Sequence, residues 1–471
     1  MKLSLSHKAN VSLISSRLRV CESFDIIERH LEIGGEDVCF FYIDGFTKDP
    51  EMQRMMQFLL SQKQLSSADK LVRSLPYLEV ELGAGVDSIV TAVLSGQTAL
   101  LSSAFPCESI LVDLRTYPAR STSEPDSDRV MQGSRDGFVE TLIMNTALIR
   151  RRIRDPRLTM RHFDIGGSSH TDVVLCYIDG VASSKLVKSL ADKLKSVKPD
   201  GVCLGYRSIT ETLIRHGWLN PFPKIRLTER PDTAAAQLLE GSVLIITDTS
   251  PQVMILPTSI FDYLQQTDDY YFPPLTGTYL RLVRTLILIL SVIVTPVWYL
   301  CLEYADTLPA YLEFLVPSDT GALPIIFQLL LVEVAIDGLK IASMNTPDML
   351  SSSLSVVGAL LLGDFAVGVG WLCQDVILYT AFVAIAGFAQ QNVELGYAFK
   401  FVRVLMLILT YFLGVWGLIA GALIFVLLVA TNVTLGDTHG YLYPLIPFNP
   451  RAMAHLLFRA KKKDFYKEDN G

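Results

Sequence analysis

The sequence predicts an α/β N-terminal half made of two similar subdomains, followed by an α-helical C-terminal half that crosses a membrane several times. Two observations predict this fold class. Charge-rich sequence gives way near Tyr279 to a stretch, 279–433, in which apolar runs dominate and charges are sparse. Several runs reach the roughly 20 residues that a membrane-spanning helix needs. A short pattern also occurs twice in the N-terminal half, as DVCFFYIDG and DVVLCYIDG, about 135 residues apart.

Composition excludes several classes of function. The formal net charge of −7 gives no electrostatic support for a nucleic-acid partner. The 7 cysteines are scattered and form no CxxC pair, which fits a reducing compartment and argues against a structural zinc site. No phosphate-binding loop, HExxH or nucleophile elbow is present. We therefore expect no enzyme, no cofactor and no metal.

Each copy of the repeated pattern predicts a buried strand that ends in an Asp-Gly turn and leads into a helix. The helices are expected at about 49–64 and 183–197. Further strands are expected at 88–94 and 98–103 in the first copy, and at 242–247 and 252–256 in the second. Asp44 and Asp179, at the two strand ends, are expected to form turns rather than to catalyse.

The predicted domains follow from this repeat. They are a first subdomain at 1–125, a connecting helix with an arginine cluster at 126–157, and a second subdomain at 158–275. Arg150, Arg151 and Arg152 end the connecting helix. They either form a solvated helix end or contact lipid headgroups or acidic residues of a neighbouring subunit.

The membrane domain is expected at 279–435, with 4–6 crossings, and a basic tail at 436–471. Its apolar runs are 281–302, 323–344, 353–373, 376–397 and 401–433. Basic residues flank the first and last runs, and the first loop carries only acids, so both termini are expected in the cytoplasm. Since this needs an even number of crossings, either the second run does not span or the last run breaks near 414–421. The N-terminus lacks a cleavable secretory signal, which agrees with a cytoplasmic N-terminal half.

Charges within the apolar runs are the sharpest functional feature. Glu333, Asp337 and Lys340 recur at helical spacing, so they share one face of the second run. Asp364 and Glu394 lie in the third and fourth runs. Charges at membrane depth usually face a bundle interior, an ion pair or water. Lys340 could therefore neutralise Glu333 or Asp337. Alternatively, the acids could line a water-filled path that favours cations.

Small residues predict close helix contacts. Gly417 and Gly421 form a GxxxG pattern in the last run, and Gly363 lies in the third. Such spacing lets helix backbones approach closely and supports packing or oligomerisation.

Two long segments carry a resemblance to a known family. GFVETLIMNTALIRRRI at 137–153 and RPDTAAAQLLEGSVLIITDTSPQVMILP at 230–257 are similar to signatures of the A-subunit (GerA) family of bacterial spore germinant receptors. In the membrane half, DGLKIASMNTP at 337–347 and PLIPFNPRA at 444–452 resemble the stage V sporulation protein AF branch of that family. The chain departs from receptor A subunits at 339–343, where they usually carry Leu-Arg-Glu-Ala-Gly.

The resemblance implies an integral, multi-pass protein of the inner membrane of the bacterial spore. It implies a ring-like homo-oligomer that conducts ions during germination, and other small membrane or germination proteins as partners. We expect a channel that releases monovalent cations, with the charged stripe near the pathway. The alternative is a ligand-sensing or scaffold subunit of a receptor complex that has no pore of its own.

Overall fold

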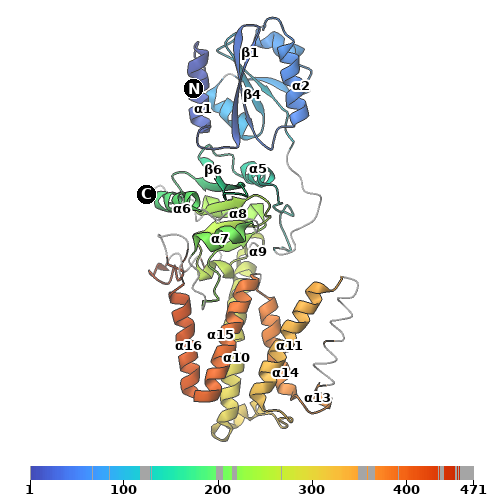
Figure 1. The fold of residues 1–471 in the computed structure, drawn as a ribbon, viewed down its shortest axis with the longest axis vertical. Helices are drawn as coiled ribbons and strands as arrows, with labels where there is room; N and C mark the ends of the chain where they lie inside the picture. Colours follow the sequence, from blue (N-terminus) through green and yellow to red (C-terminus); the bar gives the residue numbers. More distant parts are fainter. Residues whose placement is uncertain are drawn as a thin grey trace. The chain divides into compact units, whose positions relative to one another are not determined.

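The computed structural model describes residues 2–65, 67–83, 85–116, 128, 130–197, 205–214, 220–266, 268–347, 358, 366–390, 392–432, 434, 440–450, 453 and 456. The chain divides into two compact units (Figure 1). Unit 1 comprises Met1–His216, Ile225–Thr258 and Thr434–His439, and unit 2 comprises Gly217–Lys224, Ser259–Val433 and Gly440–Gly471.

Unit 1 begins with a subdomain built on a five-stranded antiparallel sheet of order β1-β2-β4-β5-β3. Its elements are α1 (His7–Leu18), β1 (Ile26–Ile33), β2 (Glu36–Ile43), α2 (Asp49–Leu60), α3 (Ala68–Ser74), β3 (Val80–Gly83), α4 (Val86–Leu94), β4 (Thr98–Ser102) and β5 (Ser109–Val112). Side chains of α1 and α4 pack on one face of the sheet. Those of α2 and α3 pack on the other, so the subdomain has three layers.

The second subdomain repeats this architecture with the strand order β6-β7-β9-β10-β8. Its elements are α5 (Leu142–Arg152), β6 (Leu158–Ile165), β7 (Thr171–Ile178), α6 (Ser184–Ser196), α7 (Tyr206–Leu213), β8 (Arg226–Thr228), α8 (Pro231–Leu239), β9 (Val243–Thr247) and β10 (Val253–Leu256). Helices α5 and α8 cover one face and α6 and α7 the other. The predicted duplication of an α/β subdomain is therefore confirmed.

Each copy of the repeated sequence pattern forms one strand, β2 in the first subdomain and β7 in the second. β2 and β7 are largely buried, and two residues after the end of each strand stands a glycine with a positive φ, +80° at both Gly45 and Gly180. That conformation is strained for residues with a Cβ, which explains the Asp-Gly ending. The expected helices follow as α2 and α6, where Leu186, Leu190 and Leu194 form the buried stripe of α6.

One predicted strand is wrong. Residues 88–94 lie in α4, whose buried side chains include Val86, Ile89 and Val93 at helical spacing. A short apolar run with β-branched residues fits either a strand or a buried helix, and here tertiary packing decides. The partner of β4 is β5, which matches the pairing of β9 with β10.

The helix expected to connect the subdomains is instead part of the second one. Leu148 and Ile149 of α5 pack with Ala234 and Leu238 of α8 and with Leu244 of β9. In the repeat, α5 occupies the place that α1 has in the first subdomain.

Unit 2 is a bundle of helices preceded by short turns. Its elements are η1 (Ile260–Leu264), α9 (Asp268–Tyr271), α10 (Pro274–Glu303), η2 (Ala305–Thr307), η3 (Ala310–Leu315), α11 (Ile325–Asn345), α13 (Ala366–Gly368), α14 (Gln374–Phe388), α15 (Val393–Leu413) and α16 (Val415–Ala430). Helix α10 packs against α14 and α15, α11 contacts both of these, and α15 packs along α16. The last apolar run is thus two helices, broken at Gly414, whose φ is +54°.

Among the described residues, α10 and α15 are long and apolar enough to cross a membrane, and α14 and α16 are shorter apolar helices. Most of the third predicted run and of the predicted basic tail lie outside the described residues.

Candidate functional site

A group of charged side chains lies inside the apolar bundle of unit 2. Glu333 and Asp337 come from α11, one helical turn apart, and Lys400 and Arg403 come from α15. Arg403 and Glu333 are buried, at 6% and 8% exposed. We call these four residues the ion-pair network.

Arg403 is the more buried of the two cations in the ion-pair network. Its Nε and Nη2 donate to Oε1 of Glu333 at 3.0 and 2.7 Å. Its Nη1 donates to the backbone carbonyl of Ser291 on α10, at 3.0 Å. One guanidinium therefore ties together three helices, in the forked geometry for which arginine is suited.

Lys400 is the less buried of the two cations. Its Nζ lies 2.6 Å from Oδ2 of Asp337 and 3.2 Å from Oε2 of Glu333. It also donates to the Glu333 carbonyl at 2.9 Å. Two acids and two cations balance, which is the arrangement that makes charges tolerable away from water. The side chain of Asp337 remains 34% exposed, so this end of the network is open.

The pairing differs from the one considered from sequence. Lys340 does not neutralise Glu333 or Asp337; its Nζ lies 4.7 Å from the ring centroid of Tyr397 and 5.7 Å from that of Phe388. Such aromatic faces attract cations. Glu394 is exposed in the first turn of α15, where the helix dipole favours an acid, two residues after the capping Asn392. Asp364 and Gly363 lie outside the described residues.

Sequence reasoning missed the two cations of the network. Lys400 precedes the run drawn at 401–433, and Arg403 lies near its beginning, so neither was counted among the membrane charges. Their spacing of three residues places them on one face of a helix, a signal that matches the spacing of the acids on α11.

A second buried charge group lies at the start of α10. Asp269, fully buried, accepts from Arg284 Nη1 at 3.1 Å and from Arg281 Nε at 3.3 Å. Arg281 and Arg284 are the basic residues that flank the first apolar run and predict its orientation. They also fix α9 against α10.

The predicted packing glycines Gly417 and Gly421 lie where α16 meets α15. A Cβ added at Gly417 would overlap the backbone of Leu409, and one at Gly421 would press on the side chain of Met406. Only glycine permits this approach of the two helices.

The arginine cluster of α5 has internal partners. Arg150 is 0% exposed, and its Nε and Nη2 donate to Asp25 at 2.8 and 3.1 Å. Its Nη2 also donates to the Leu158 carbonyl at 3.0 Å. Because Arg150 is enclosed by both subdomains of unit 1, it neither ends a solvated helix nor reaches lipid or another subunit, which corrects both sequence readings.

Arg151 and Arg152 differ from Arg150 in exposure. Arg152 donates to Asp136 at 2.8 Å and is partly buried. Arg151 is exposed. Of the three, Arg151 has the exposure that a subunit or lipid contact needs.

The repeated Asp-Gly carboxylates have unlike surroundings. Burial is the main cause that raises the pKa of Asp44 above its usual value. Asp179 instead accepts from Arg19 at 2.8 Å. Neither arrangement resembles an acid–base pair.

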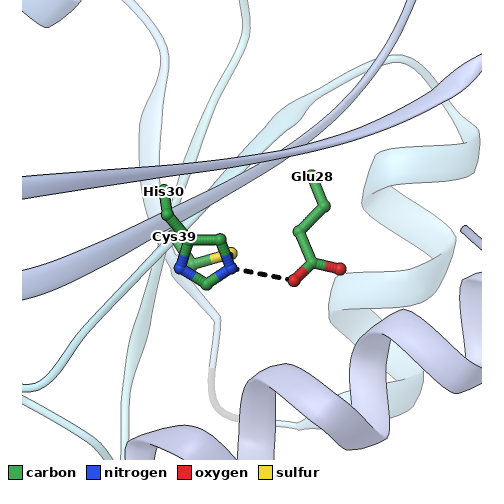
Figure 2. A group of neighbouring side chains, drawn as sticks. All are labelled: Glu28, His30 and Cys39. Atoms are coloured by element: carbon green, nitrogen blue, oxygen red, sulfur yellow. Dashed lines mark hydrogen bonds and ion pairs between the residues drawn. The ribbon is translucent and has the colours of Figure 1, made fainter.

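Among the described residues, one group of side chains could hold a metal ion. Glu28 and His30 of β1 and Cys39 of β2 offer a carboxylate oxygen, a ring nitrogen and a thiol sulfur, all within 4.8 Å of one another (Figure 2). Sequence patterns do not predict this group, because the three residues become neighbours only through the register of the strands.

Known proteins resemble this chain over nearly its full length. A family model described as Bacillus/Clostridium GerA spore germination protein matches residues 13–470. Stage V sporulation protein AF of Bacillus subtilis (strain 168) is 34% identical over 458 residues, 96% of this chain and 92% of that protein. Spore germination protein KA of the same organism is 27% identical over 460 residues, 95% and 84% of the two chains.

A solved structure also matches part of the chain. The N-terminal domain of the A subunit of the Bacillus megaterium spore germinant receptor GerK3 is 26% identical, with a TM-score of 0.39. The match covers 54% of this chain and 96% of that one.

Proposed function

Because the chain belongs to the GerA family of spore germination proteins, as its sequence motifs predicted, we propose that it is a subunit of an oligomeric channel that releases monovalent cations during germination. The helices of unit 2 cross the inner membrane of the spore several times, and copies of the chain assemble as a ring. Other germination proteins are partners in this assembly.

The outer surface of unit 2 supports insertion in a membrane. Helices α10 and α15 are long enough to span, and large apolar side chains are exposed along the bundle. Examples on five helices are Leu286, Ile289, Leu331, Phe382, Phe401, Phe412 and Leu423. Exposed apolar surface of this extent is unfavourable in water and favours lipid or neighbouring subunits.

The observation that carries the channel proposal is the open end of the ion-pair network. Asp337 lies among apolar helices, yet a third of its side chain remains accessible. A carboxylate at membrane depth is stable only beside a cation or water. Paired to Lys400 on one side, Asp337 presents its other side to a path in which a cation can replace water.

The test is a flux measurement on the full-length protein. The purified chain, with its germination partners, is reconstituted in K⁺-loaded liposomes, and K⁺ release is recorded. We expect release from the wild type, and a reduction on the order of tenfold with Asp337→Asn, equivalent to ~1.4 kcal/mol on the barrier. Asparagine keeps the size of the side chain and removes its charge.

The matched control is Asp375→Asn, which removes an acid from the first turn of α14, outside the ion-pair network. It should leave K⁺ release unchanged. Absence of K⁺ release from the wild type in every assembly state would overturn the channel proposal.

A scaffold or ligand-sensing subunit is the second candidate. It is favoured by the balance of the network, since Glu333 already pairs with both Arg403 and Lys400. Alanine at Glu333 or Asp337 separates the candidates. A scaffold predicts loss of assembly with no separate effect on ion release, whereas a channel predicts altered release from normally assembled protein.

A further inference from the structure

The first subdomain carries a set of side chains that the proposed function does not use. Glu28, His30 and Cys39 point to the same face of the sheet, the one that α1 covers. His30 and Cys39 are directly paired across β1 and β2, and Glu28 lies two residues before His30 on the same strand. Side chains two residues apart on one strand, and side chains directly opposite on β1 and β2, lie on the same face of the sheet. The three side chains are therefore brought together.

From this geometry we propose that Glu28, His30 and Cys39 form a zinc(II) site. Zinc binds to carboxylate oxygen, imidazole nitrogen and thiolate sulfur at about 2.0–2.3 Å, which places ligand atoms roughly 3.3–3.7 Å apart in a tetrahedral site. Nε2 of His30 lies 2.9 Å from Oε1 of Glu28 and 3.8 Å from Sγ of Cys39. Small side-chain rotations bring these distances to the required values.

The other nitrogen of His30 has the partner that zinc-bound histidines usually have. Nδ1 of His30 lies 3.5 Å from Oδ1 of Asp37. A carboxylate in this position orients the ring, fixes the proton on Nδ1 and leaves Nε2 free to bind metal. Nε2 is also the nitrogen that faces both Glu28 and Cys39 (Figure 2).

The duplicated subdomain supplies an internal comparison. The strand registers place Met160, His162 and Val174 at the positions of Glu28, His30 and Cys39. There His162 bonds Asp172 with Nε2, at 2.7 Å. Two apolar residues thus suffice for the fold at positions where the first copy carries a carboxylate and a thiol.

A cavity gives the site an entrance and room for a fourth ligand. It measures about 670 Å³ and is lined by Glu28, His30 and Asp37 together with residues of α1. His7 is on its wall, 8% exposed; its Nε2 lies 3.6 Å from Oδ2 of Asp37, and neither ring nitrogen makes a hydrogen bond among the described residues. Such a buried, unsatisfied group fits a site whose occupant is a metal-bound water or a polar group that enters with the metal.

Zinc binding requires the thiolate of Cys39, so the thiol proton passes to solvent as the Zn–S bond forms. No oxidation or reduction takes place. With three protein ligands and one open position, the site has the composition of an exchangeable or reactive zinc centre rather than a closed structural one.

The test uses the full-length protein in detergent and Co²⁺ as a spectroscopic substitute for Zn²⁺. We expect about one Co²⁺ per chain, a thiolate-to-cobalt charge-transfer band, and loss of that band when Zn²⁺ is added. Cys39→Val should abolish the band, and Glu28→Met should weaken binding. Both substitutions install the residues of the second subdomain, which folds with them, so that folding is preserved.

Controls separate a zinc site from incidental thiol binding. Cys107→Val alters an exposed cysteine, and His162→Ala alters the histidine of the second copy; both should leave the band intact. Asp37→Asn should weaken Co²⁺ binding about 10–100-fold. Absence of a charge-transfer band in the wild type, or its persistence in Cys39→Val, would overturn the proposal.

Discussion

At the scale of residues, two buried ion pairs of this protein join positions that are far apart along the chain. Asp25 lies 125 positions before Arg150, and Glu333 lies 70 positions before Arg403. The sequence shows that such charges exist and that they need partners. It does not show which distant segment supplies the partners. For this reason the sequence patterns place Arg150 at the surface and do not single out Arg403.

The Arg150–Asp25 pair provides a prediction about stability. Arg150→Ala leaves a buried carboxylate without its cation, which typically costs about 3–5 kcal/mol. We expect a clear fall in the unfolding temperature of unit 1. The measurement is protease digestion of the full-length protein during heating. Arg151 is the next residue and is exposed. Arg151→Ala should therefore change the free energy of unfolding by less than about 0.5 kcal/mol. Equal effects of the two substitutions would contradict the structural role of the buried pair.

At the scale of elements, patterns that span a whole segment predict the structure well and short apolar runs do not. The repeated strand, the Asp-Gly turn and the helix after it were predicted in both copies because each has its own local signal. Residues 88–94 have only apolar character, which a strand and a buried helix share. The second copy resolves this ambiguity, since α8, the counterpart of α4, begins with Pro231 and a helical first turn.

The packing of α15 on α16 provides a prediction at this scale. Gly417→Ala places a methyl group against the Leu409 backbone, which cannot move aside as a flexible side chain can. Overpacking of this kind costs about 1–3 kcal/mol. We expect a lower aggregation temperature of the purified protein, measured by size-exclusion chromatography after heating. Gly387→Ala in α14, where the added atom meets nothing within 4 Å, is the matched control and should not lower it.

At the scale of the whole molecule, the charges outside the helices predict the direction of the first membrane crossing. The loop between α10 and α11 carries Asp306, Glu313 and Asp319 and no lysine or arginine, whereas Arg281 and Arg284 lie at the opposite end of α10. From the positive-inside rule we expect the start of α10 in the cytoplasm. The break at Gly414 divides the last apolar run into α15 and α16, so we expect two crossings there, in keeping with the even number that two cytoplasmic termini require.

This orientation can be tested by the accessibility of single cysteines. In spheroplasts that express an otherwise cysteine-free chain, we expect a membrane-impermeant maleimide to label Asp306→Cys, which lies in the exposed loop after α10. In a second chain that keeps Cys107 as its single cysteine, this thiol, exposed in unit 1, should react only after the membrane is permeabilised. Since both positions are accessible on the folded chain, any difference in labelling reports the membrane between them. Labelling of Cys107 in intact spheroplasts would mean that unit 1 lies outside, and that the acidic loop faces the cytoplasm against the charge rule.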